Sequence, residues 1–229
     1  MVKTKSIEKL FLHILIYTYL LIPIVGFFFK IKKKDGLLIG IYGLTFFALL
    51  SLAFYHVVST SYLYISIYTF LEYCFFTAIL WNNISLKRLR LAIVVCSIFF
   101  IGCQIFIYLN FHGGMDSIPI GIETILIFVY IIFFFYQNFR NNFDQFIYDH
   151  YGFWLSIGMM IYLGGTFFFN LLANYLDPRD MDKYWYLTFI ADIIKNIFFC
   201  VAIIIYSRGH LQKKIFHHSS VPYLDLDMN

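Results

Sequence analysis

Charged residues are scarce in this chain: Asp, Glu, Lys and Arg together make up 13% of its 229 residues. Soluble globular domains contain about 25% of these residues. Apolar residues account for 61% of the chain, aromatic residues for 22%, and the mean hydropathy is +0.77. A surface that faces water cannot be built from this composition, so a soluble fold is excluded and we expect a lipid bilayer as the main solvent.

Signatures of familiar chemistry are also missing. The sequence contains no GxxxxGK[ST], GxGxxG, HExxH or GxSxG motif, which leaves nucleotide binding and the common hydrolase sites without support. Its four cysteines show neither metal-ligand spacing nor a disulfide framework, and they are Cys74, Cys96, Cys103 and Cys200. We therefore assign no catalytic residue, metal or cofactor. The net charge of +4 is attributed to loops beside the membrane and not to nucleic-acid binding.

What the chain does contain is a series of long apolar runs. A bilayer core about 30 Å thick is crossed by roughly 20 helical residues. Seven runs of about that length lie approximately at residues 10–29, 37–57, 62–81, 91–110, 118–137, 153–174 and 185–206. They predict an all-α, polytopic membrane protein with a seven-transmembrane-helix bundle in residues 1–207 and a cytoplasmic tail in residues 208–229.

The positive charges predict the orientation of this bundle. Eleven of the 17 Lys and Arg residues fall on one side, namely Lys30, Lys32, Lys33, Lys34, Lys87, Arg88, Arg90, Arg140, Arg208, Lys213 and Lys214. The opposite side receives Lys3, Lys5, Lys9, Arg179 and Lys183. Because the side with the excess stays in the cytoplasm, we expect a cytoplasmic C-terminus and an N-terminus outside.

The basic start, MVKTKSIEK, resembles the front of a signal peptide. The run that follows ends in lysines without a small-residue cleavage site, so we expect the first span to be retained. Cleavage would leave six helices instead of seven.

Ionisable residues inside a membrane are costly and mark functional sites. Counted along the predicted helices, Glu72 and Lys195 lie near the midplane, Asp192 about one turn above Lys195, and Glu123 further out. Three acids thus share one base. We expect Lys195 to pair with Asp192 or with Glu72, which leaves at least one acid able to bind a proton or a cationic ligand.

Uncharged polar residues gather in the same outer half. Tyr162, Thr166 and Asn170 have the four-residue spacing of one helix face, and Gly158, Gly164 and Gly165 would allow close approach of a neighbour. Together with the charged groups, the candidate ligand- or proton-binding residues are Glu72, Glu123, Asp192, Lys195, Gln104, Asn170, Tyr162, Thr166, His13 and His56. We interpret them as an outward-opening polar pocket. The alternative is that the uncharged members only join helices, at roughly 1 kcal/mol each.

A mid-depth lysine in the last of seven helices also resembles the layout of retinal proteins, in which such a lysine carries the Schiff base. The likeness ends at the layout, because the acid lies three and not four residues before Lys195, and no acid-Trp pair includes Glu72. The tryptophans lie at span ends, as in an interfacial belt, and are Trp81, Trp154 and Trp185. Retinal on Lys195 therefore stays a minor alternative.

The segments FWLSIGMMIYLGGTFFFNLLANYL (153–176) and YWYLTFIADIIKNIFFCVAIIIY (184–206) resemble small uncharacterised seven-helix inner-membrane proteins of Bacteroidota. This resemblance covers the last two predicted helices, and the helix number and chain length agree with it. It implies a bacterial inner (plasma) membrane and a relation to membrane modules that accompany sensor kinases. It transfers no catalytic residues.

The sequence therefore predicts a membrane receptor or signalling subunit that relays an unknown small ligand or a proton to a separate protein partner. A proton-coupled or small-solute transporter is the first alternative, although the chain shows no internal repeat and no matching pair of Gly/Pro-broken helices. A membrane enzyme using His13, His56 and the acids, or a purely structural subunit, are further alternatives.

Overall fold

The structure, a computed structural model, describes residues 2–29, 36–58, 62–110, 117–141, 147–173 and 186–218. These ranges contain seven α-helices and one short 3-10 helix. They are α1 (Val2–Phe28), α2 (Gly36–Val58), α3 (Tyr62–Asn83), α4 (Lys87–Asn110), α5 (Ser117–Asn141), η1 (Ile147–Asp149), α6 (Tyr151–Ala173) and α8 (Tyr186–His218).

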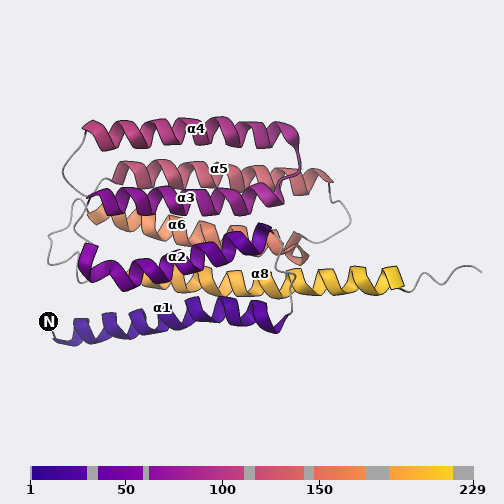
Figure 1. The fold of residues 1–229 in the computed structure, drawn as a ribbon, viewed down its shortest axis with the longest axis horizontal. Coiled ribbons are helices and arrows are strands. Elements are labelled where there is room, and N and C mark those ends of the chain that lie inside the picture. Colours follow the sequence, from indigo (N-terminus) through magenta and orange to yellow (C-terminus); the bar gives the residue numbers. More distant parts are fainter. Residues whose placement is uncertain are drawn as a thin grey trace, which may run out of the picture.

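Consecutive helices run in opposite directions and lie roughly along one common axis (Figure 1). The start of α1 and the end of α8 lie at opposite ends of the bundle (Figure 1). In packing, α8 lies against both α6 and α1, whereas α3 contacts α2, α4 and α5. The last helix of the described chain, α8, therefore lies beside the first helix, α1, and beside the preceding described helix, α6.

Five helices in the described residues are long and apolar enough to cross a membrane: Lys9–Phe28, Lys87–Asn110, Ile118–Arg140, Tyr151–Phe169 and Tyr186–Arg208. Residues Gly36–Leu52 of α2 form a shorter apolar helix. Many large apolar side chains are exposed on the outside of the bundle, as expected for a surface that faces lipid. The prediction of an all-helical, multi-pass membrane protein is confirmed.

Two helices are longer than the apolar runs that predicted them. The first helix begins at Val2 and not near Leu10, and the last continues to His218 although its apolar run ends at Tyr206. Hydrophobicity marks only the part of a helix that meets lipid, whereas the backbone hydrogen bonds of a helix continue equally well through polar residues. Part of the segment expected as a cytoplasmic tail is therefore a continuation of α8.

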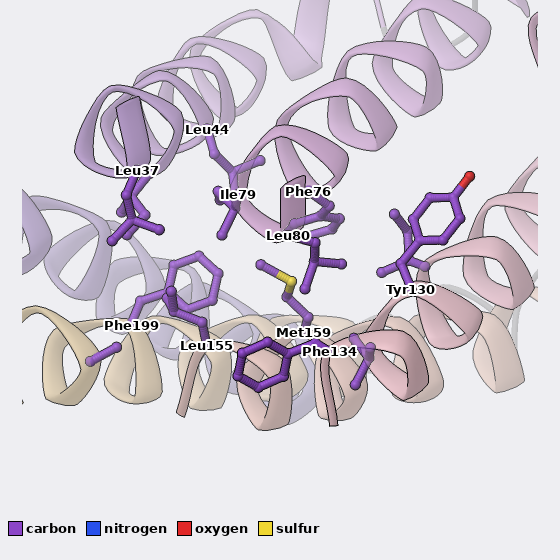
Figure 2. Packing of buried hydrophobic residues seen from close by; sticks show 14 of the residues in the cluster. Leu37, Leu44, Phe76, Ile79, Leu80, Tyr130, Phe134, Leu155, Met159 and Phe199 are labelled. Carbon is purple, nitrogen blue, oxygen red and sulfur yellow. The ribbon is translucent and has the colours of Figure 1, made fainter. Parts of the chain in front are cut away.

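A large apolar core lies between α2, α3, α5, α6 and α8. Figure 2 draws some of its buried side chains and labels Leu37, Leu44, Phe76, Ile79, Leu80, Tyr130, Phe134, Leu155, Met159 and Phe199. Since lipid tails are as apolar as these side chains, the core holds the helices together through close packing more than through transfer from water.

Two glycines of α6 allow an especially close approach to α8. A Cβ atom at Gly158 would lie 3.0 Å from the Cβ atom of Phe198 and 3.3 Å from the backbone oxygen of Lys195. One at Gly165 would lie 3.0 Å from the Cβ atom of Ala191. The expectation that glycines on this helix admit a close neighbour is met at these two positions, and the neighbour is α8.

The turn between α3 and α4 is held by a side chain of α5. The Gln137 Oε1 atom accepts hydrogen bonds from the backbone N–H groups of Ser85, at 2.7 Å, and Leu86, at 3.0 Å. The Arg90 Nε atom donates to the backbone oxygen of Ile84 at 2.6 Å. These bonds satisfy backbone groups that neither helix can pair, so this end of the bundle is fixed.

His150 links η1 to the first turn of α6. Its Nδ1 atom accepts a hydrogen bond from the backbone N–H of Gly152 at 3.1 Å, and its ring lies 4.6 Å from that of Tyr151 and 5.7 Å from that of Phe134. Burial lowers the pKa of the His150 imidazole from its usual 6.5. Its unprotonated nitrogen therefore caps the helix in the folded protein.

This cap predicts a loss of stability in mild acid. As the pH falls below about 6.5 the unfolded chain takes up a proton at His150 before the folded protein does, so the folded state is disfavoured. We expect the melting temperature in detergent to fall by about 2 °C more between about pH 7.5 and about pH 5.5 in the wild type than in His150→Asn, which keeps a cap without titrating. His13→Asn, at an exposed histidine, is the matched control, and it should leave the pH dependence unchanged. Equal pH dependence of the wild type and His150→Asn would contradict this account.

Candidate functional site

The last helix carries a buried ion pair. Lys195 Nζ donates a hydrogen bond to Asp192 Oδ1, one turn earlier on α8. The Lys195 side chain is 2% exposed and that of Asp192 is 14% exposed. Of the two partners that the sequence allowed for Lys195, Asp192 makes the direct ion pair. An unpaired ammonium group at this depth would be strongly unfavourable, so the pair stabilises both charges.

Helix α1 supplies a hydroxyl group to the same carboxylate. Tyr19 donates from its hydroxyl to Asp192 Oδ2 at 2.7 Å, and its side chain is 2% exposed. Next to it, the Asn196 Nδ2 atom donates to Thr18 Oγ1 at 3.1 Å. Consecutive residues of α1 thus bind polar groups on successive turns of α8, which fixes the rotation of one helix against the other.

On the other side of Lys195 lies an aromatic ring of α6. The Nζ atom of Lys195 is 4.0 Å from the centroid of the Tyr162 ring and 5.5 Å from that of Tyr19. A cation at this distance over an aromatic face is attracted by about 2 kcal/mol when water is excluded. The approach depends on the close packing of α6 against α8 at Gly158 and Gly165.

Glu72 on α3 completes the site. Its carboxyl group is hydrogen-bonded by the hydroxyls of Tyr162 and Tyr68, and it interacts with the charges of Lys195 and Asp192. It is 6% exposed. We refer to these side chains as the charged cluster, which consists of Tyr19, Tyr68, Glu72, Tyr162, Asp192 and Lys195.

Beside this cluster, α5 places a further acid. Glu123 is 1% exposed, and its Oε1 atom has no hydrogen-bond partner among the described residues. Its carboxyl group interacts electrostatically with that of Glu72. A buried polar atom without a partner costs free energy, so this acid needs either a proton or a ligand to be stable.

The charges of the site do not balance. Glu72, Glu123 and Asp192 carry up to three negative charges, whereas Lys195 supplies one positive charge. In a region of low dielectric constant the excess must be reduced by taking up a proton or a cation. No group of three or more His, Cys, Asp or Glu side chains suited to a metal ion occurs in the described part of the chain.

Other predicted site residues make local contacts instead. Gln104 is buried, and its Nε2 atom donates to the backbone oxygen and the Oγ atom of Ser66, both at 3.1 Å, so it joins α4 to α3. Thr166 Oγ1 donates to the backbone oxygen of Tyr162 in its own helix at 2.8 Å. The interpretation of uncharged polar groups as contacts within and between helices fits these two residues better than membership of the cluster.

The histidines do not join the cluster where they are described. His13 is exposed, and its Nδ1 atom lies 2.6 Å from the backbone oxygen of Lys9 one turn earlier. His56 and Asn170 lie on α2 and α6, but their side chains are outside the described residues.

Two members of the cluster were not predicted from the sequence. Tyr19 and Tyr68 are two of 19 tyrosines, and nothing in the local sequence separates them from those that only pack. A hydroxyl group becomes a marker of a site only when an acid on another helix faces it. Another tyrosine hydroxyl joins α3, α4 and α5. The Tyr73 hydroxyl oxygen lies 2.8 Å from the Oγ atom of Ser97 and 2.9 Å from the hydroxyl oxygen of Tyr130.

The charged cluster therefore unites side chains from α1, α3, α6 and α8, and a further acid from α5 lies beside it. Its hydroxyl and ammonium groups are donors directed at carboxylates, an arrangement that suits the binding and release of a charge. The chain matches no protein-family model, no curated protein and no solved structure.

Proposed function

We propose that this protein is an integral membrane receptor or signalling subunit with seven transmembrane helices, which relays binding at the charged cluster to a separate partner. One observation carries the proposal. The helix that holds Asp192 and Lys195 is also the helix that extends beyond the rest of the bundle, as far as His218 (Figure 1). Ten further residues after Arg208 lengthen it by about 15 Å, which is enough to present a surface to a partner.

The proposed orientation follows from the basic residues. Exposed cations gather at the end from which α8 projects, at Lys87, Arg88, Arg140 and Arg208. We place this end in the cytoplasm and the N-terminus outside. Asp192 and Glu123 then belong to the outer half, from which a ligand or proton would arrive. The resemblance to Bacteroidota inner-membrane proteins supports a bacterial plasma membrane and a kinase-like partner.

The proposed mechanism is a small movement of α8. Three helices hold α8 through the charged cluster, by Tyr19 on α1, Glu72 on α3 and Tyr162 on α6. A change in charge at the cluster alters these three attachments unequally. The helix then occupies a different position at its projecting end, as a two-state switch requires.

A proton-coupled transporter is the second candidate, because buried acids that share one base are also the core of many proton pathways. The two functions differ in what crosses the membrane. A receptor moves its cytoplasmic end without carrying protons or solute across the membrane, whereas a transporter must carry one or both.

Spin labels distinguish the two. We would replace Arg140 on α5 and Arg208 on α8, both exposed, with cysteine in a chain whose four native cysteines are alanine. Distances between the labels would be measured in nanodiscs for two labelled proteins, one with the native charged cluster and one with Glu72→Gln. We expect Glu72→Gln to shift the mean distance by about 2 Å or more.

The same proteins in liposomes with an enclosed pH dye should show no proton flux above that of empty vesicles. Proton or solute flux that is lost in Glu72→Gln would favour the transporter. If the distances between the labels do not change and no proton or solute flux is found, the cluster has only a structural role and the receptor function is contradicted.

A further inference from the structure

We propose that Glu123 and Glu72 form a proton-binding site in which Glu123 holds a proton at neutral pH and Glu72 takes up a second proton as the pH falls. The second proton is then the stimulus that the cluster relays. The meaning of that stimulus rests on the proposed receptor function, whereas the two proton positions follow from the surroundings of each acid.

The first step concerns Glu123. It is 1% exposed, one of its oxygen atoms lacks a partner in the described residues, and the charge that acts on it is that of another carboxylate, Glu72. Among the residues that the structure describes, no cation forms an ion pair with it, in contrast to Asp192, which has Lys195. Holding a proton removes the uncompensated charge and supplies a donor, so Glu123 is the acid of the three that is best kept neutral.

The second step concerns Glu72, whose surroundings are balanced between its two forms. The hydroxyls of Tyr68 and Tyr162 and the charge of Lys195 stabilise its carboxylate, whereas burial and the charge of Asp192 oppose it. Contacts that favour the carboxylate and contacts that favour the protonated acid therefore meet at this one group. Asp192, in contrast, accepts direct bonds from both Lys195 and Tyr19.

The titratable groups around the pair come from several helices. From α3, Tyr68 and Cys74 also interact with the Glu123 charge. Tyr19 on α1 interacts with the Glu72 charge. On α4, which packs against α5, the Cys103 thiol lies at a comparable depth by residue count. Within the described part of the chain, the charges that act on the site are those of Glu72, Glu123, Asp192 and Lys195.

Protonation of Glu72 explains how the site would move α8. As a carboxylate, Glu72 attracts Lys195 and accepts from Tyr162, so it draws α8 and α6 toward α3. Once protonated, it loses the attraction to Lys195 and one of its oxygen atoms becomes a donor, so a tyrosine hydroxyl that donates to that atom has to reorient. Lys195 then keeps Asp192 as its ionic partner. The attachment of α8 to α3 is thus released while its attachment to α1 is kept.

Infrared spectroscopy tests the proton positions directly, because a protonated carboxyl group has a C=O stretch that a carboxylate lacks. We would record spectra of the full-length protein in nanodiscs at about pH 7.5 and about pH 5.5. A buried protonated-carboxyl band is expected at neutral pH in the wild type and in Glu72→Gln, and its absence in Glu123→Gln. A second band should grow on acidification in the wild type and not in Glu72→Gln. Asp149→Asn, at an exposed acid, is the matched control and should change neither buried band.

Three results would overturn the proposal. They are a wild type without the neutral-pH band, a band that survives Glu123→Gln, or a band that disappears when Na⁺ or K⁺ is added at constant pH, which would assign the site to a cation. If Glu123→Gln does not fold, Glu123→Asp, which should move the neutral-pH band instead of removing it, decides the assignment. Bands that behave as expected without any change in the distance between labels at Arg140 and Arg208 on acidification would keep the proton site and reject the receptor function.

Discussion

Replacing Lys195 with methionine is expected to lower the free energy of unfolding by about 3–5 kcal/mol, because it leaves a buried carboxylate without its cation. Methionine retains the length of the aliphatic chain, so little packing volume is lost at a residue that is 2% exposed. The Asp192 carboxylate would keep one hydrogen bond, from Tyr19. The Glu72 carboxylate would lose the positive charge that acts on it. The fraction of folded protein against SDS concentration measures this loss.

Two further variants separate the ion pair from its surroundings. Lys195→Met with Asp192→Asn removes both charges and should recover about half of the stability, since no carboxylate is then left facing a missing partner. Lys87→Met, at an exposed lysine that begins α4, should change the stability by less than about 0.5 kcal/mol. If Lys195→Met alone were as stable as the wild type, the ion pair would contribute nothing to the fold, and the relay through α8 would lose its physical basis.

The sequence was most informative where lipid imposes a rule. Apolar runs located every helix of the described bundle, and to within a few residues except at the start of α1 and the end of α8, because the thickness of the bilayer sets the length of the apolar part. The spacing of Asp192 and Lys195 placed a partner for the lysine within reach on the same helix, with Glu72 as the alternative, and the structure contains the pair with Asp192. Both inferences depend on neighbours along the chain.

Contacts between distant segments could not be predicted in this way. Tyr19 and Asp192 are 173 residues apart, and the partner of a tyrosine hydroxyl depends on which helices pack together. The same holds for Gln104, whose polar side chain suggested a ligand pocket but which bonds to Ser66. The extension of α8 was missed for another reason, because its polar residues resemble those of an unstructured tail.

A second large effect is expected from Gly158→Leu on α6, which should destabilise the protein by about 3 kcal/mol. The first side-chain atom would already lie 3.0 Å from the Cβ atom of Phe198 and 3.3 Å from the backbone oxygen of Lys195. Neither atom is at the end of a flexible side chain, so α6 and α8 must move apart. That separation also withdraws the ring of Tyr162 from the Lys195 ammonium, now 4.0 Å away.

The matched control for this variant is Gly102→Leu on α4, because a Cβ atom there would meet nothing within 4 Å and the new side chain would extend into lipid. Both variants add the same atoms to a transmembrane helix, so general effects on insertion cancel in the comparison. Unfolding in SDS should separate them by several-fold in the folded fraction at the wild-type midpoint. Gly158→Ala, which adds only the Cβ atom, should fall between the two. Equal stability of Gly158→Leu and Gly102→Leu would mean that α6 and α8 do not depend on close contact, and the position of Tyr162 over Lys195 would then need another cause.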